Sequence, residues 1–240
     1  MKRQQQGFTL IEIAIVLVII GLLLGGVLKG QELITSARVR NLISQQDGVK
    51  AAFFGFQDRF RALPGDYATA STNLKCGSGN CLNGNGNGQI QSNATPVSGS
   101  EVHEEILAWS HLTAANFLNG SYNMTAGDTA QTDANSPKNP YSIYMQLVYD
   151  SNYADSTAAT NKHNLKTGSQ VPVEILAEVD RKIDDGNPLQ GGFRFSPFVP
   201  NGGTALPAPA ATYSAGVCAS TAGTWFSTNS ETNCGGASLF

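Results

Sequence analysis

The sequence is poor in the residues that enzymes use for catalysis. Only 14% of its 240 residues are charged, and it has only three histidines. It contains no G-x-S-x-G nucleophile motif, no Walker-type lysine loop and no dinucleotide-binding glycine pattern after an expected strand. We therefore expect a protein without enzymatic activity and without a cofactor, apart from a weak calcium candidate described below.

Basic residues are also scarce. Fifteen Lys and Arg residues face 18 Asp and Glu residues, which gives a formal net charge of −3 at pH 7. Surfaces that bind nucleic acid are usually strongly basic. Nucleic acid is therefore not an expected partner.

Cysteine is limited to four residues, which are Cys76, Cys81, Cys218 and Cys234. Neither pair has the C-x-x-C spacing that is typical of a four-thiolate zinc site. Four cysteines allow three disulfide pairings, and Cys76–Cys81 together with Cys218–Cys234 is the most local of them. Because disulfides form in oxidising compartments, we expect this part of the chain to lie outside the cytoplasm.

A long apolar run stands near the N-terminus. Phe8 to Leu28 comprises 21 residues with a single ionisable group. At about 1.5 Å per helical residue, this run crosses a hydrocarbon core of roughly 30 Å. Signal-peptide cores are shorter, about 7–15 residues, and precede a small-x-small cleavage site, which is poor here. The run predicts a membrane helix, and Lys2 and Arg3 before it predict a cytoplasmic N-terminus and an exported C-terminal domain.

Glu12 is the one ionisable residue within this run. A carboxylate in a membrane segment is costly, so it is a functional hypothesis by default and needs a partner. No Lys, Arg or His lies between Arg3 and Lys29 to provide one within the helix. The simpler alternative places Glu12 near the interface, in the first helical turn, where the helix dipole favours an acid.

The N-terminal residues resemble those of type IV pilins and type II secretion pseudopilins. A short basic leader, residues 1–7, ends in Gly7 and is followed by Phe8-Thr9-Leu10-Ile11-Glu12 and the apolar helix. The resemblance implies that a prepilin peptidase cleaves between Gly7 and Phe8 and methylates the new amine of Phe8. It also implies that Glu12 neutralises the N-terminal amine of a neighbouring subunit during filament assembly.

The resemblance further implies a function and a location. The chain is expected to be a structural subunit, major or minor, of a type IV pilus or a type II secretion-like filament. Expected partners are copies of itself or related pilins, the peptidase, inner-membrane assembly machinery and the lipid bilayer before assembly. It would be a single-pass inner-membrane protein with a periplasmic head, and later part of an extracellular or periplasmic filament. The alternative is a membrane-tethered or filament-tip binding module that recognises a ligand, a surface or DNA.

The expected fold is α+β and pilin-like, with four segments. These are the leader (1–7), a transmembrane and assembly helix (8–28), an amphipathic stem helix (29–62) and a globular head of antiparallel strands, extra helices and long loops (63–240). The stem is predicted from an apolar face, and Pro64-Gly65 predicts its end in a type II turn. The apolar face comprises Val39, Leu42, Val49, Phe53, Phe56, Phe60 and Leu63.

Residues 67–99 are rich in Gly, Asn and Ser and predict a long loop. Within it, the side chains of Asn83, Asn85 and Asn87 and the backbone carbonyl of Gln89 have the spacing of the first half of an EF-hand calcium loop. Amides replace the usual carboxylates, and Ala94 stands where a closing Glu is needed. An asparagine-turn loop is the alternative. An anion for calcium would have to come from one of four acids, Asp66, Glu101, Glu104 or Glu105.

The rest of the head predicts two helices and two strands. A capping box, Ser98 with Glu101, opens a helix that runs to Gly120, on which we expect His103, Glu104, Glu105 and His111 to be solvated charges. Pro172 opens another helix, which ends at the acids 184–185; with Asp180 these acids indicate either a helix terminus or a cation site. Residues 141–149 and 193–195 alternate as strands do.

Overall fold

The structure is a computed structural model that describes residues 9–77, 79–92, 102–200, 218–228 and 232–240. The chain divides into two compact units, Met1–Arg38 and Val39–Phe240. This division falls inside the predicted stem rather than at its ends. The functional segments predicted from the sequence, with boundaries after residues 7, 28 and 62, stay a prediction.

Helix α1 (Leu10–Phe60) is the longest element, with 51 residues. No proline interrupts it, and the predicted continuation from the apolar segment into an amphipathic one is confirmed. The helix ends where Arg61 takes a left-handed φ of 53°, shortly before Pro64. Gly65 then has a φ of 88°, and a Cβ there would lie 2.4 Å from the carbonyl oxygen of Glu104, so only glycine fits this turn.

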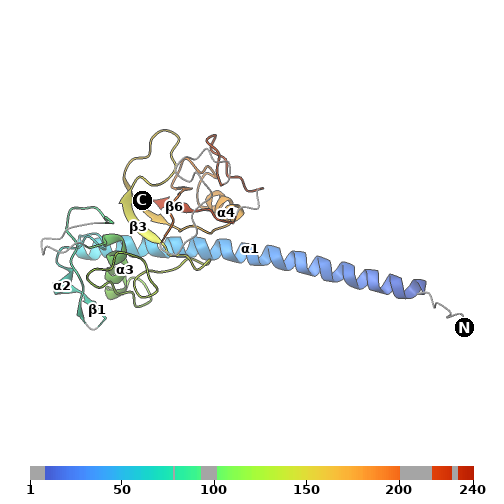
Figure 1. Cartoon of the computed structure of the whole chain (residues 1–240), viewed down its shortest axis with the longest axis horizontal. Helices are drawn as coiled ribbons and strands as arrows, with labels where there is room; N and C mark the ends of the chain where they lie inside the picture. Colours follow the sequence, from blue (N-terminus) through green and yellow to red (C-terminus); the bar gives the residue numbers. More distant parts are fainter. Residues whose placement is uncertain (1–8, 78, 93–101, 201–217, 229–231) are drawn as a thin grey trace, which may run out of the picture. The chain divides into compact units, whose positions relative to one another are not determined.

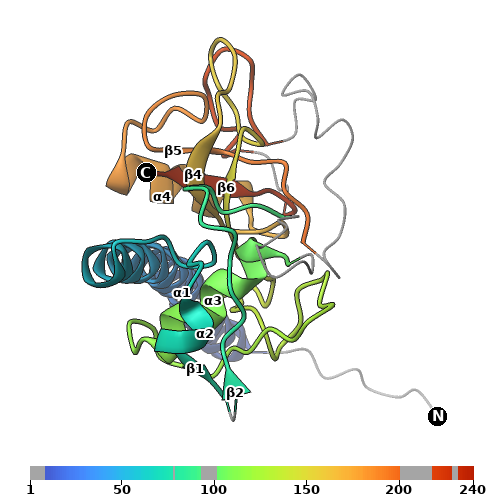
Figure 2. The ribbon, with the colours of Figure 1, turned by 90° about the vertical axis from the view of Figure 1, so that its left-hand side faces the viewer.

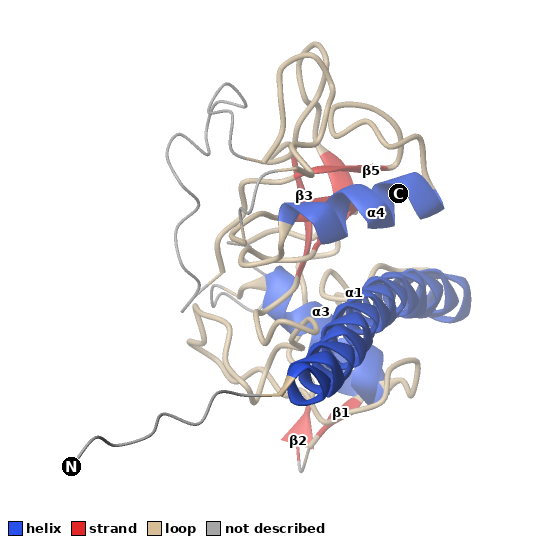
Figure 3. Ribbon diagram, turned by 90° about the vertical axis from the view of Figure 1, so that its right-hand side faces the viewer, coloured by secondary structure: helices blue, strands red, loops and turns tan. Residues whose placement is uncertain are grey.

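Four strands form one antiparallel sheet in the second unit. They are β3 (Gln146–Asp150), β4 (Lys162–Lys166), β5 (Phe193–Phe195) and β6 (Gly236–Leu239), in the order β3-β4-β6-β5. Leu147 is opposite Leu165 in β4, and Leu165 is opposite Ser238 in β6. Helix α4 (Val173–Ile183) packs against β5, as Figure 3 shows. The expected α+β class with antiparallel strands is therefore confirmed.

Smaller elements lie close to the C-terminal end of α1. They are α2 (Ala70–Asn73), the two-stranded hairpin of β1 (Lys75–Cys76) and β2 (Gly79–Asn80), and α3 (Glu104–Ala114). In Figure 2 they lie on one side of this end of α1, and α4 with the sheet lies on another. In Figure 1, likewise, α2, β1 and α3 lie below α1, and α4 and the sheet lie above it. The long loop predicted for residues 67–99 thus contains a helical turn and a hairpin that its polar composition did not indicate.

The part of α1 from Val39 onward contributes to two hydrophobic clusters. Val39 and Leu42 pack in the first, against α4, β5 and the segment around Trp225. Val49, Phe53 and Phe56 belong to the second, with α3, β3 and β4. The predicted apolar face is therefore the buried face, and each large side chain fully removed from water there contributes about 1.5–3 kcal/mol.

The expectation for the charges of α3 is wrong. Glu104 and His111 are fully buried and Glu105 is 4% exposed, whereas we expected solvated side chains. Glu104 and His111 are covered by segments that are distant in the sequence, the turn at Gly65 and the loop of residues 83–91, called the Asn-Gly loop below. The helix begins at Glu104 with His103 at its N-cap, while Ser98 and Glu101 of the predicted capping box lie outside the described residues. Ile183, predicted on the buried face of α4, is 37% exposed.

Candidate assembly and processing site

The described chain begins with a reciprocal capping arrangement at the start of α1. Thr9 donates two hydrogen bonds to the same oxygen of Glu12, Oε2, from its backbone nitrogen (2.8 Å) and from its hydroxyl (2.7 Å). In return, the backbone nitrogen of Glu12 donates to the Thr9 hydroxyl oxygen at 3.3 Å. This is a capping box, and the T-x-x-E pattern that predicts it is visible in the sequence.

The capping box gives Glu12 a partner within its own chain. Among the described residues, its second oxygen, Oε1, accepts no hydrogen bond. The carboxylate is therefore fixed in orientation at the N-terminal end of α1, with one oxygen still available. An additional positively charged donor can approach it there without breaking the cap.

The first half of α1 exposes an uninterrupted apolar surface. Every large hydrophobic side chain from Leu10 to Leu28 is between 45% and 88% exposed. By length and composition, α1 is the one helix among the described residues that could cross a membrane, and it lies near the N-terminus. Apolar surface of this extent is normally covered by lipid or by another chain.

The predicted processing residues precede Thr9 in the sequence. Gly7 and Phe8, predicted to flank the cleavage site, lie outside the described residues, as does the rest of the basic leader. Their roles stay predictions.

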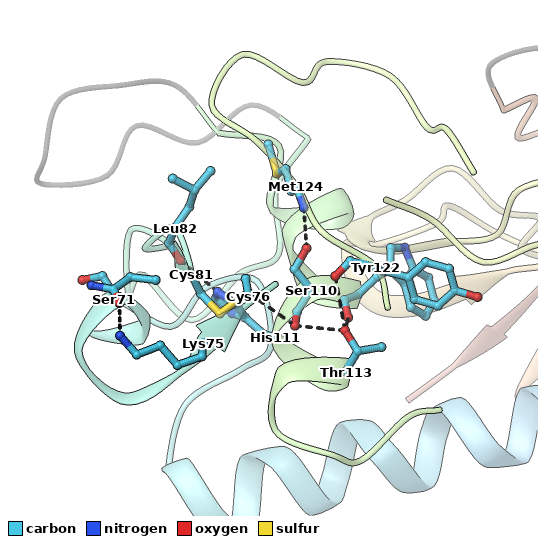
Figure 4. The surroundings of a disulfide bond; sticks show 12 residues. Ser71, Lys75, Cys76, Cys81, Leu82, Ser110, His111, Thr113, Tyr122 and Met124 are labelled. Carbon is cyan, nitrogen blue, oxygen red and sulfur yellow. Dashed lines mark hydrogen bonds between the residues drawn. A yellow bond between two sulfur atoms is a disulfide. The ribbon is translucent and has the colours of Figure 1, made fainter. Parts of the chain in front are cut away.

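Both disulfides have the local pairing that the sequence favours. Cys76 is bonded to Cys81, with Cα atoms 4.7 Å apart, and Cys218 is bonded to Cys234, with Cα atoms 5.8 Å apart. The first joins the last residue of β1 to the residue after β2 and faces α3, where Cys76 Sγ lies 3.7 Å from the carbonyl oxygen of Ser110 (Figure 4). The second closes a loop with a sequence separation of 16, a length for which a disulfide contributes about 3 kcal/mol in the chain-entropy model.

His111 joins three segments of the head. Its Nδ1 accepts a hydrogen bond from the backbone nitrogen of Gly65 (2.9 Å), and its Nε2 lies 2.9 Å from the carbonyl oxygen of Leu82. The carbonyl of Leu82 can only accept a hydrogen bond, so Nε2 carries a proton, whereas Nδ1 accepts one and carries none. The imidazole is therefore neutral, with its proton on Nε2. Complete burial agrees with this, because it lowers the pKa of His111 to about 4.

Two buried carboxylates hold the Asn-Gly loop. Asp66 accepts hydrogen bonds from the backbone nitrogens of Asn87 (2.9 Å) and Gly88 (2.7 Å). Glu104 accepts from those of Asn85 (2.9 Å) and Gln91 (3.0 Å). Burial raises the pKa of Asp66 and raises that of Glu104 to about 7, although the accepted hydrogen bonds favour the ionised form.

The calcium candidates lie in this loop. The side-chain oxygen of Asn83 accepts from the nitrogen of Ser71 (2.7 Å), that of Asn85 from Asn87 (3.0 Å) and that of Asn87 from Gln89 (2.9 Å). The bonds of Asn85 and Asn87 are asparagine turns, the alternative to a calcium loop, whereas Asn83 joins the loop to α2. Of the four acids proposed to supply an anion, Asp66 and Glu104 do contact the loop. Calcium binding stays a prediction.

A calcium titration tests this prediction. Because hydrogen bonds already satisfy the three asparagine oxygens, we expect about 1 mM calcium to shift the thermal midpoint of the full chain in detergent micelles by less than roughly 1 °C. Magnesium at the same concentration is the control for ionic strength. A calcium-specific rise of several degrees would establish the site that the spacing of Asn83, Asn85 and Asn87 suggested.

Three acids lie at the end of α4, Asp180, Asp184 and Asp185. One carboxylate oxygen from each lies within 4.8 Å of those from the other two. Each accepts a hydrogen bond from the protein. Asp180 accepts from Trp225 Nε1 (2.6 Å), Asp184 from the backbone nitrogen of Phe193 (2.8 Å), and Asp185 from that of Asn187 (2.8 Å). Burial raises the pKa of Asp180 to about 6. Asp180 and Asp184 thus join the end of α4 to the C-terminal segment and to β5, and a cation site at this cluster stays a prediction.

Comparison with known proteins identifies the N-terminal segment. Residues 2–28 match the family model of the prokaryotic N-terminal methylation motif. This motif is the signature of type IV pilins and pseudopilins, and with the apolar helix it supports a pilin-like or pseudopilin-like precursor. The family that carries the motif is structural rather than enzymatic. No curated protein and no solved structure matches the chain.

Proposed function

We propose that the chain is the precursor of a structural subunit, major or minor, of a type IV pilus or a type II secretion-like filament. The methylation motif at residues 2–28 is the observation that carries this proposal. It is supported by the exposed apolar surface of α1, which needs a cover of lipid before assembly and of other subunits afterwards.

In this proposal the basic leader stays in the cytoplasm and the head is exported. A prepilin peptidase removes residues 1–7 and methylates the amine of Phe8. The mature helix then leaves the bilayer and packs its apolar side chains against those of neighbouring subunits. Glu12, held by Thr9, offers its free oxygen to the amine of a neighbour and so sets the register between chains. The two disulfides suit an oxidising compartment for the head.

Two measurements on one preparation test the proposal. Surface material sheared from cells is examined by electron microscopy with an antibody to the head, and the mass of the N-terminal peptide is determined. We expect label along fibres and a peptide that begins with N-methylated Phe8. A surface chain that still begins at Met1, or one absent from any fibre, would refute the filament role.

The second candidate is a binding module that is tethered to the membrane or placed at a filament tip. A groove in the second unit, described next, favours it as a role of the same molecule. Label confined to fibre tips would support this arrangement, whereas label along whole fibres would support a major subunit.

A further inference from the structure

The second unit contains an open groove of about 670 Å³. Its sides are formed by the last two turns of α1, by the segment after α1 that leads to α2, and by His163 and Phe240 at the end of the sheet. Gly86 and Gly88 of the Asn-Gly loop also line it. Small-molecule sites in proteins commonly have volumes of about 300–1,000 Å³, so the groove has room for one or two ring-sized ligands.

Aromatic side chains line the groove in two contacting pairs. Phe54 and Phe240 form one pair, with ring centroids 6.0 Å apart, and Phe60 and Tyr67 form the other, with centroids 5.4 Å apart. Phe54 is 51% exposed. Among the described residues beyond Ile34, the only other exposed large hydrophobic side chain is Ile183, at 37%. The groove therefore offers an aromatic surface to a ligand.

Polar groups accompany these rings. Gln57 and Thr69 line the groove together with one cation, Arg61, and one buried acid, Asp66. The only ion pair of Arg61 among the described residues is with Asp58, at 3.5 Å, and both side chains are more than 80% exposed. Such a pair is weak and leaves the guanidinium available to a ligand. In addition, Nε2 of His163 has no hydrogen-bond partner among the described residues.

The lining restricts the chemistry of the ligand. One positive and one negative group balance each other, so a strongly charged ligand gains little. A purely apolar ligand would cover Arg61 and Gln57 without giving them hydrogen bonds, which is unfavourable. A nucleic acid would meet a chain with net negative charge. The class of ligand that remains is a neutral ring. Its apolar face would pack on the aromatic side chains, and its hydroxyls would hydrogen-bond to the polar groups.

We propose that this groove is a saccharide-binding site, in which a pyranose ring packs against Phe54 and hydrogen-bonds to Gln57 and Arg61. The apolar C–H face of a pyranose matches an aromatic ring, and its hydroxyls both donate and accept hydrogen bonds, as Gln57 also does. Binding at this site needs no second copy of the chain, because all of its residues belong to one unit, Val39–Phe240.

The test uses the full chain in micelles of a detergent without a sugar headgroup. The probes are the methyl glycosides of glucose, galactose, mannose and N-acetylglucosamine, titrated by calorimetry and by saturation-transfer NMR. We expect at least one of them to bind with a dissociation constant on the order of 1–10 mM. Phe54→Ala should weaken that binding by roughly tenfold and Gln57→Ala by several-fold, whereas Phe54→Trp should retain it.

Ile183→Ala is the matched control, because it removes an exposed hydrophobic side chain on α4, outside the groove. It should leave binding unchanged, and all variants should keep the thermal midpoint of the wild type. Failure of every glycoside to saturate at about 50 mM, or binding that survives Phe54→Ala, would overturn the proposal. Binding of adenosine monophosphate without any glycoside would overturn it in favour of a nucleotide site. None of these outcomes depends on whether the chain forms filaments.

Discussion

Glu12→Ala is expected to leave the chain in the membrane but to reduce its incorporation into filaments by at least about tenfold. Insertion depends on the apolar run from Ile13 to Leu28, which the substitution does not change. Assembly, in the function we propose, depends on a carboxylate that pairs with the amine of a neighbouring chain. The measurement is the ratio of the chain in sheared fibres to the chain in membranes, determined with an antibody to the head.

Two further variants separate the charge of Glu12 from its capping role. Glu12→Gln keeps a side-chain oxygen that can accept from Thr9 but removes the negative charge, so we expect it to be nearly as defective as Glu12→Ala. Thr9→Val removes the hydroxyl that donates to Glu12 and keeps the carboxylate, so we expect only a small loss. A loss in Thr9→Val as large as in Glu12→Ala, with Glu12→Gln close to wild type, would assign Glu12 to capping alone. Normal incorporation of Glu12→Ala would remove the register role altogether.

The sequence predicted the features of this fold that depend on local pattern. The unbroken helix through residue 60 follows from the apolar run, the later amphipathic spacing and the first proline at Pro64. The α4 and β5 elements follow from their own periodicity. Strands β4 and β6 were not predicted, because KHNLK and GASL have no alternation of large apolar residues. They exist because β3 and β5 provide neighbours that pair with them.

Burial of polar residues was the least predictable feature. Glu104 and His111 have the composition of a solvated helix surface, and nothing in the local sequence shows that the Gly65 turn and the Asn-Gly loop cover them. The same holds for Lys166, which is fully buried in β4 beside Asp150 and Gln146. In the candidate assembly site, by contrast, the T-x-x-E pattern contains enough information to predict the cap of Glu12.

His111→Ala is expected to lower the free energy of unfolding by about 3–5 kcal/mol. The substitution creates a cavity and leaves two buried groups without partners, the backbone nitrogen of Gly65 and the carbonyl oxygen of Leu82. His111→Asn should lose less, because the amide oxygen can take the place of Nδ1 and accept from Gly65. Thermal or urea unfolding of the full chain in micelles measures both values. A loss below about 1 kcal/mol for alanine would show that His111 does not hold these segments together.

The advantage of wild type over His111→Asn is expected to shrink in acid. The pKa of His111 is about 4 in the folded chain and 6.5 when unperturbed, so below pH 6.5 the unfolded chain takes up a proton that the folded chain does not. The neutral imidazole makes its full contribution to the free energy of unfolding above pH 6.5. This contribution falls by about 3 kcal/mol as the pH approaches 4.

Glu104 and Asp180 act in the opposite direction, because burial raises their folded pKa values to about 7 and about 6. Their protonation stabilises the folded chain as the pH falls. Both acids are present in wild type and in His111→Asn, so their effects cancel when one unfolding free energy is subtracted from the other at each pH. Unfolding curves at intervals between pH 7.5 and pH 4 therefore isolate the histidine. A difference that stays constant over this range would mean that His111 is not held neutral between Gly65 and Leu82.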